Sequence, residues 1–153
     1  GVMRPMRPST RLGEPLLVLA VFLADRASKL WAQEWLAPVF SLRILPFFRL
    51  TYVENTGAAW GMFQGRNVLL IALSVGLLGG LLYMRRGWPK DEKLLHYGAA
   101  LVAGGALGNL YDRIALGYVI EFFDFIVWPV FNIADSAITT GACLLAFGMR
   151  EKR

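Results

Sequence analysis

Two residue types that often mark a chemical site are almost absent, since the chain has one cysteine, Cys143, and one histidine, His96. A single cysteine excludes an intrachain disulfide, and its apolar neighbours predict a small core residue. One histidine excludes an H-E-x-x-H zinc helix, and no metal or other cofactor is expected. Ser28 and Lys29 are adjacent in sequence, so they point to different faces of a helix and do not form a serine–lysine catalytic pair.

Charged residues are also scarce: they make up 18% of the 153 residues, whereas 56% are hydrophobic. With a mean hydropathy of +0.49, the chain is too apolar for an ordinary soluble domain, and we predict one membrane domain over residues 1–153. The net charge of +5 does not indicate nucleic-acid binding. The basic residues cluster where apolar runs end, which is a pattern of membrane topology.

Four apolar stretches predict transmembrane helices, because each is near the roughly 17 to 25 residues that a spanning helix needs. They cover about residues 12–35, 68–84, 94–111 and 127–149. The first stretch resembles a secretory signal peptide, but three further spans favour an uncleaved helix.

Two segments, 36–67 and 112–126, are expected on the outer side of the membrane. The β-branched and aromatic residues of 40–54 predict strands there. The predicted fold is therefore an all-α membrane protein with a small β element: four transmembrane helices and a short extracytoplasmic β-sheet lying on the membrane.

Positive charge predicts the orientation of these helices. If the chain crosses the membrane four times, ten of the 16 basic residues fall on one side: Arg4, Arg7, Arg11, Arg85, Arg86, Lys90, Lys93, Arg150, Lys152 and Arg153. That side is expected to be the cytoplasm, and it holds both termini. The opposite ends of the helices face outward.

Glycine pairs predict close helix contacts. Gly76 and Gly80 in the second stretch, and Gly104 and Gly108 in the third, follow the small-xxx-small pattern that lets membrane helices approach one another.

Asp135 is a carboxylate inside the fourth apolar stretch. A charge at the bilayer centre costs at least about 2.5 to 3.5 kcal/mol, so such an acid indicates a functional site. No basic residue lies within one helical turn of it. A second carboxylate nearby would raise its pKa, and the two would share one proton, the arrangement that aspartic proteolysis uses.

Other polar residues gather at the predicted outer ends of the spans. Asp25 and Lys29 are spaced i, i+4, and they are expected to form an ion pair, as are Asp112 and Arg113. Further members of this group are Asn55, Asn109, Glu121, Asp124, Asn132 and Thr139. Asn132 has a second interpretation, in which it only satisfies backbone groups around Pro129.

A proton-coupled transporter is the alternative from another class, with Asp135, Glu121 and Asp112 as the relay. The absence of an internal repeat and the position of the acids toward one face argue against it. A non-catalytic membrane scaffold is a third interpretation, favoured only if Glu121 abolishes chemistry.

Five blocks of sequence, in order, resemble the lipoprotein signal peptidases, also called signal peptidase II. The blocks are Asp25-Arg-Ala-Ser-Lys29, Glu54-Asn-Thr-Gly-Ala-Ala-Trp60, Gly104-Gly-Ala-Leu-Gly-Asn-Leu-Tyr-Asp-Arg113, Gly117-Tyr-Val-Ile-Glu-Phe122 and Phe131-Asn-Ile-Ala-Asp-Ser-Ala137. The third and fifth blocks are nearly diagnostic alone, and the match runs across almost the whole chain.

The resemblance implies an aspartyl protease of the bacterial inner membrane that acts on diacylglyceryl-modified prolipoproteins, among membrane lipids and as a monomer. It implies no metal or organic cofactor. By matched position Asp135 is one catalytic residue, and Asp25, Lys29 and Asp112 are structural polar residues. The residues implied to bind substrate are Asn55, Gly57, Asn109, Arg113 and Asn132.

The chain departs from the family pattern at the second catalytic position. The family has aspartate in a V-V-D-F block, where ungapped alignment from Gly117 places Glu121, and relatives often carry a further acid at the position of Asp124. Glu121 is therefore the expected partner of Asp135 and Asp124 the fallback partner. In a third interpretation the chain is a catalytically impaired variant.

Overall fold

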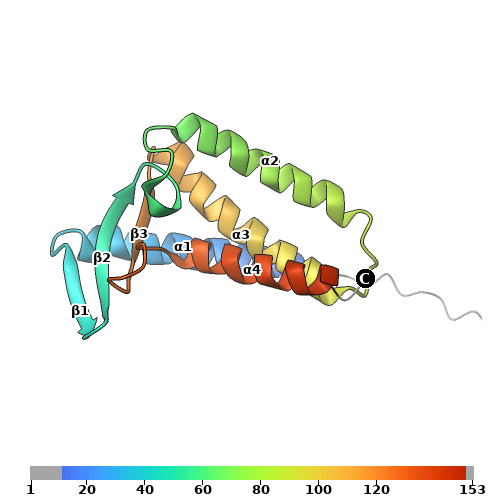
Figure 1. Cartoon of the computed structure of the whole chain (residues 1–153), viewed down its shortest axis with the longest axis horizontal. Helices are drawn as coiled ribbons and strands as arrows, with labels where there is room; N and C mark the ends of the chain where they lie inside the picture. The colour runs from blue at the N-terminus through green and yellow to red at the C-terminus, as the bar shows by residue number, and fades with distance from the viewer. Residues whose placement is uncertain (1–11, 151–153) are drawn as a thin grey trace, which may run out of the picture.

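A computed structural model describes residues 12–150 as a bundle of four helices with a three-stranded antiparallel sheet at one end (Figure 1). Five of the basic residues used above to predict orientation lie outside this range: Arg4, Arg7, Arg11, Lys152 and Arg153.

Each predicted apolar stretch contains a helix. They are α1 (Gly13–Trp31), which a π-helical turn extends over Ala32–Leu36, α2 (Asn67–Arg85), α3 (Lys93–Ala115) and α4 (Ile133–Arg150). Within residues 12–150, length and apolar composition alone identify α2 as a candidate membrane span.

Two helix boundaries differ from the prediction. Helix α4 begins at Ile133 rather than at residue 127, because Pro129 lacks an N–H and the segment before Ile133 instead pairs Phe131 with Phe123. Helix α3 continues beyond residue 111 to Ala115, so the segment after it is shorter than predicted.

The sheet has the order β1-β2-β3, with β1 at Ser41–Leu45, β2 at Phe48–Asn55 and β3 at Val119–Asp124. The first two strands lie in the segment where the sequence predicts strands, and they form an antiparallel hairpin, whereas β3 was not predicted. Successive residues of a strand point to opposite faces, so Glu121 and Asp124, three positions apart, face opposite sides of β3. This alternation separates Glu121, the expected partner of Asp135, from Asp124, the fallback partner.

One face of β3 packs on the end of the first helix. Ile120 and Phe122 form a buried cluster with Ala32 and Leu36 of the π-helical turn. Glu121, which lies between them in sequence, therefore points away from that cluster.

Helix α3 is central, since it packs against α1, α2 and α4. Gly104 and Gly108 allow its close approach to α1, because a Cβ there would lie 2.8 Å from Val21 Cβ and 2.4 Å from Asp25 Oδ2, respectively. The prediction of close contact at Gly76 and Gly80 of α2 is wrong within the described residues, where no atom lies within 4 Å of either added Cβ.

The core assignment of Cys143 is also wrong. The residue is exposed on α4. An apolar sequence context does not distinguish a helix face that meets other helices from one that meets lipid.

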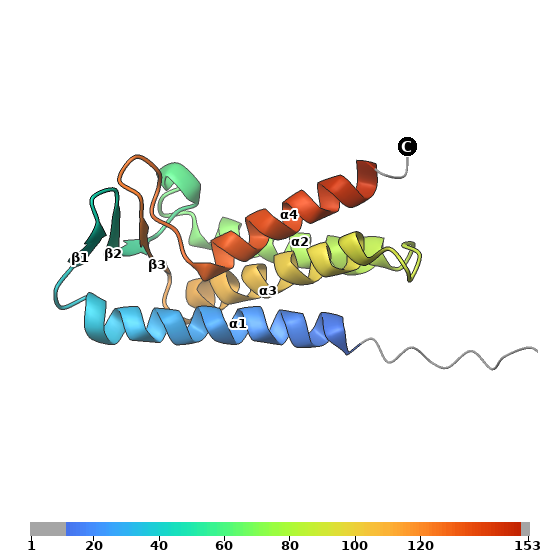
Figure 2. The ribbon, with the colours of Figure 1, turned by 90° about the horizontal axis from the view of Figure 1, so that it is seen from below.

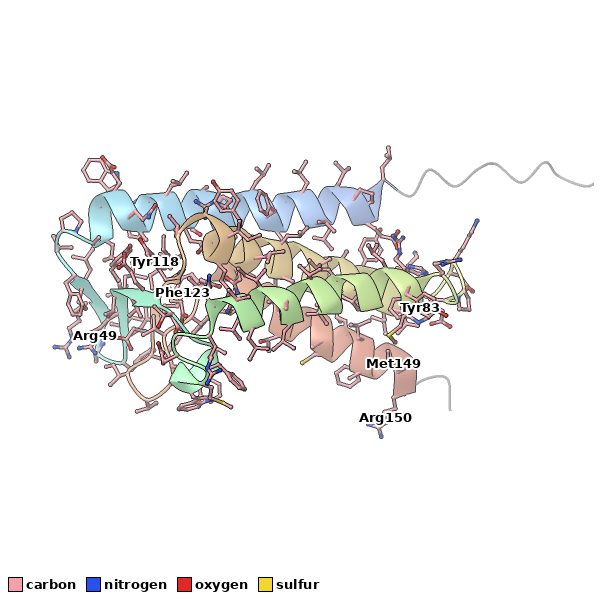
Figure 3. All side chains as sticks on the ribbon, turned by 90° about the horizontal axis from the view of Figure 1, so that it is seen from above. Arg49, Tyr83, Tyr118, Phe123, Met149 and Arg150 are labelled. Atoms are coloured by element: carbon pink, nitrogen blue, oxygen red, sulfur yellow. The ribbon has the colours of Figure 1, made fainter. Side chains whose placement is uncertain are left out.

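The bundle has one end at the sheet and an opposite end at which helix ends and a loop gather. The start of α1, the α2–α3 loop and the end of α4 lie at the end opposite the sheet (Figure 2). Arg49 of β2 marks the sheet end, and Tyr83 and Arg150 mark the other (Figure 3).

The contact between α3 and α4 provides a test of the packing. A Cβ at Gly105 would lie 2.4 Å from the backbone oxygen of Ala134. We expect Gly105→Ala to destabilise the protein by about 1 to 3 kcal/mol, the usual cost of overpacking. Gly76→Ala is the matched control and should be neutral or stabilising. The measurement is thermal unfolding in detergent, and equal midpoints for the two variants would contradict the packing.

Candidate active site

The amino terminus of α4 holds Asp135 in a reciprocal cap. The N–H of Asp135 donates to Asn132 Oδ1 at 2.8 Å, and the N–H of Asn132 donates to Asp135 Oδ2 at 3.1 Å. This is the geometry of a capping box, with an aspartate three residues into the cap and close to the positive end of the helix dipole. The late start of α4 thus fixes the position of the carboxylate.

Asn109 of α3 supplies a second donor to the same carboxylate. Its Nδ2 donates to Asp135 Oδ1 at 2.9 Å, while its Oδ1 accepts from Asn132 Nδ2 at 3.0 Å. Asn132 Nδ2 also donates to the carbonyl of Ile120 in β3 at 3.0 Å. Asn132 therefore both caps the helix and connects α3, α4 and β3.

A buried ionic network lies behind these amides. Lys29 Nζ lies 2.6 Å from Asp25 Oδ2, as the i, i+4 spacing predicts, and 3.0 Å from Asp112 Oδ2. The predicted pair between Asp112 and Arg113 is wrong. The second cationic partner of Asp112 is Arg26, at 2.5 Å, because neighbouring residues on a helix point in different directions.

The same acids also cap backbone groups. Asp25 Oδ1 accepts the N–H of Ala134 at 3.0 Å, and Asp112 Oδ2 accepts the N–H of Ile120 at 3.1 Å. The network therefore holds the start of α4 and the strand that carries Glu121.

Glu121 is buried, with 7% of its surface exposed, and its Oε1 accepts a hydrogen bond from Asn55 Nδ2 at 2.6 Å. Burial raises the pKa of Glu121 to about 7, although the Asn55 hydrogen bond opposes this shift; the negative charge of Asp135 raises it further. Glu121 is thus an acid that can hold a proton near neutral pH.

A cavity of about 470 Å³ brings the two carboxylates together. Its lining includes both Glu121 and Asp135, together with Asn55, Asn109 and Arg113. The lining also contains Thr139, which lies one turn beyond Asp135 on α4. Residues from β2, β3, α3 and α4 therefore converge at the sheet end of the bundle.

Asp124 does not line this cavity, and its carboxylate oxygens contact other groups. It accepts hydrogen bonds from Thr51 Oγ1 at 2.7 Å and the N–H of Ile126 at 2.8 Å, and it pairs with Arg49 at 3.2 Å. Although burial favours its neutral form, these donors and the Arg49 charge hold the pKa of Asp124 below its usual range. The geometry favours Glu121 over Asp124 as the neighbour of Asp135.

The turn after β2 contributes Ala58 and Ala59 to the lining of the cavity. Gly57 donates its N–H to Asn55 Oδ1 at 2.8 Å, and Arg113 Nη2 lies 3.5 Å from the Gly57 carbonyl. Gly57 itself is buried behind the lining, where an added Cβ would lie 2.4 Å from the Met62 carbonyl. Its position fits a role in shaping the turn that presents Asn55.

Two tryptophans that line the cavity are in contact with each other, which the sequence did not predict. Trp60 and Trp128 are largely exposed, and their rings meet edge to face with centroids 5.4 Å apart. Trp128 was assigned to the fourth span, although Pro129 beside it was the signal that this segment leaves the helix. Together they give the cavity an aromatic wall.

A sequence model of the family described as "Signal peptidase (SPase) II" matches residues 17–150. The lipoprotein signal peptidase of Pelotomaculum thermopropionicum is 42% identical over 135 residues, 88% of this chain and 89% of that protein. The lipoprotein signal peptidase of Clostridium acetobutylicum is 43% identical over 139 residues, 86% of this chain and 90% of that protein.

Solved structures agree with this match. A bacterial membrane enzyme determined at 2.3 Å resolution is similar with a TM-score of 0.81 and 28% identity, covering 93% of this chain and 90% of the other. A second, determined at 1.9 Å, has a TM-score of 0.79 and 28% identity, covering 92% and 94%.

Fold, site and relatives together define a membrane protease of the aspartic type. The chain belongs to the signal peptidase II family.

Proposed function

We propose that this chain is an intramembrane aspartyl endopeptidase that removes the signal peptide from bacterial prolipoproteins, cutting just before the diacylglyceryl-modified cysteine. The observation that carries the proposal is the cavity lined by both Glu121 and Asp135. The substrate class follows from the relatives, which are lipoprotein signal peptidases.

In this proposal all four helices cross the bacterial inner membrane, with both termini in the cytoplasm. Helices α1 and α3 are less apolar than α2 because they carry charged residues, but Lys29 and Asp112 are fully buried inside the bundle. Large apolar side chains such as Leu16, Leu19 and Leu23 are exposed on α1, as expected for a lipid-facing surface. The sheet and the cavity then lie at the extracytoplasmic face, and the protein acts as a monomer that does not bind nucleic acid.

The two carboxylates divide the chemistry between them. Asp135, ionised, takes a proton from a water molecule as the water oxygen attacks the scissile carbonyl carbon, and Glu121 gives its proton to the carbonyl oxygen. A neutral tetrahedral diol results. In its breakdown Asp135 returns the proton to the leaving nitrogen, one diol hydroxyl returns a proton to Glu121, and the C–N bond breaks.

Neighbouring groups position the substrate for this step. Asn55 and Arg113 line the cavity, and the N–H groups of Arg113 suit the carbonyl oxygens of an extended peptide. Asn55 Nδ2 donates to Glu121 and to the Ala58 carbonyl, so Asn55 binds substrate by exchanging one of these bonds. The wall formed by Trp60 and Trp128 suits the apolar part of a lipidated substrate.

The proposed function is tested by incubating the purified protein with a diacylglyceryl-modified prolipoprotein. The expected result is a mass shift to the mature lipoprotein and a released signal peptide. The same substrate without its lipid is the control for substrate class. Proton flux across liposomes without any cleavage would overturn the proposal in favour of a transporter.

The pH dependence of cleavage should report the proton on Glu121. Since its pKa is raised to about 7, the group is protonated below that pH and loses its proton above it, so kcat/KM should fall as pH rises through about 7. The measurement is a pH profile with the folded fraction monitored at each pH. Constant kcat/KM well above this pKa would contradict Glu121 as the acid.

A further inference from the structure

Lys29 is a fully buried ammonium that the proposed chemistry does not use. Its Nζ lies within reach of Asp25 Oδ2 and of Asp112 Oδ2, and it also donates to Asn109 Oδ1 at 3.1 Å and to the carbonyl of Gly108 at 3.4 Å. An ammonium group has donors and no acceptor, so every group it contacts must present an oxygen. Lys29 therefore requires that Asn109 present its oxygen, as Asn132 Nδ2 also does.

The direction of this amide matters because Asn109 lies between Lys29 and Asp135. With Oδ1 held by Lys29 and by Asn132 Nδ2, the amide must turn its Nδ2 toward Asp135. The other Asp135 oxygen accepts the backbone N–H of Asn132. Both oxygens of Asp135 thus receive an N–H, and such hydrogen bonds favour the ionised form of a carboxyl group.

Glu121 has a different environment. Its Oε1 accepts one hydrogen bond from Asn55, and within residues 12–150 no hydrogen bond to Oε2 is found. The other charged groups around the two carboxylates are Arg113, which lines the cavity, and Asp25 and Asp112, which are balanced by Lys29 and Arg26. The asymmetry between the two carboxyl groups therefore arises from their amide donors.

We propose that Lys29 is a positioning residue: through Asn109 it directs an N–H at Asp135, which keeps Asp135 ionised as the base and leaves the shared proton on Glu121. This inference rests on the proposed function of the two carboxylates. In this inference, a buried lysine of the first helix determines which carboxyl group acts as the acid and which acts as the base.

Infrared spectroscopy tests the position of the proton without using activity. At a pH well below the pKa of Glu121, the protein should show a protonated carboxyl stretching band that Glu121→Gln removes and Asp135→Asn retains. The reverse pattern would overturn the assignment, even if the protein cleaves prolipoproteins as proposed. Conversely, full cleavage by Asp135→Asn would overturn the proposed function without altering the infrared result.

Two lysine variants test the route of the effect. Lys29→Met removes both the charge and the donor, whereas Lys29→Gln leaves an amide that can still donate to Asn109. We expect kcat to fall about tenfold in Lys29→Met with KM little changed, because Asp135 loses roughly one hydrogen bond that favours its charged form. For the same reason, the apparent pKa at which protonation of Asp135 reduces activity on the acidic side of the pH profile should rise. Lys29→Gln should recover much of kcat.

Folding is monitored by thermal unfolding, with exposed Lys90→Met as the matched control. If Lys29→Met does not fold, Lys29→Gln and the infrared assignment still decide the proposal. Folded Lys29 variants with unchanged kcat and unchanged pH profile would overturn it. So would a folded Lys29→Gln that is as impaired as Lys29→Met, since charge alone would then explain the loss.

Discussion

Replacing Asp135 with asparagine is expected to reduce cleavage by about 10² to 10⁴-fold or more, the usual contribution of a general base, while the protein stays folded. An asparagine can still accept the N–H of Asn132 through its amide oxygen, so the cap of α4 is retained, but its NH2 group then faces Nδ2 of Asn109, which loses its acceptor. It cannot take a proton from water. The loss should therefore appear in kcat, while the protein stays folded with an unfolding midpoint lowered by the one lost hydrogen bond.

Ser136→Ala is the matched control for this variant. Ser136 also lines the cavity, but its hydroxyl donates only to the carbonyl of Asn132, at 3.1 Å, within the same helical turn. Its removal should leave the rate within a few-fold of the unmodified protein. Cleavage by Asp135→Asn at the rate of this control would exclude the aspartyl mechanism.

Shortening Glu121 to aspartate is expected to increase cleavage, by up to about a hundredfold, because a misplacement near 1 Å can cost that much in rate. Glutamate has one methylene more than the aspartate that the family pattern has at this position. The extra length moves the carboxyl group relative to Asp135. If the unmodified protein is slow, this substitution should correct it, and kcat should change more than KM.

Asp124→Asn is the control for Glu121→Asp. An asparagine at position 124 can accept the N–H of Ile126 through its amide oxygen and can donate from its NH2 group to the Thr51 hydroxyl oxygen. It loses the ion pair with partly exposed Arg49, so cleavage should be nearly unchanged. Equal or lower activity of Glu121→Asp, combined with loss of cleavage in Asp124→Asn, would move the catalytic pair to Asp124.

Much of the fold could be predicted from local sequence patterns. The apolar stretches locate all four helices, and the i, i+4 spacing of Asp25 and Lys29 identifies their ion pair, because both signals depend on residues within one helix. The start of α4 was predicted too early, although Pro129 marked the break.

The partners of the buried charges could not be predicted in this way. Arg26 and Asp112 are 86 positions apart, and nothing in either local sequence indicates that they meet. The preference for Glu121 over Asp124 came only from alignment with the family block, and its physical basis is the face of β3 that points at the cavity. That face is decided by the packing of Ile120 and Phe122 on the first helix.

The cap that Asp25 provides to the backbone of Ala134 has a consequence for the biogenesis of the protein. The ribosome makes α1 before α4, so Asp25 is already present in the nascent chain before the helix that it caps has been made. In the proposed mechanism, the base and its supporting groups come together only when α4 has packed against α1 and α3. On this proposal, hydrolytic competence is acquired only after α4 has been made, and a chain that lacks α4 has no assembled site.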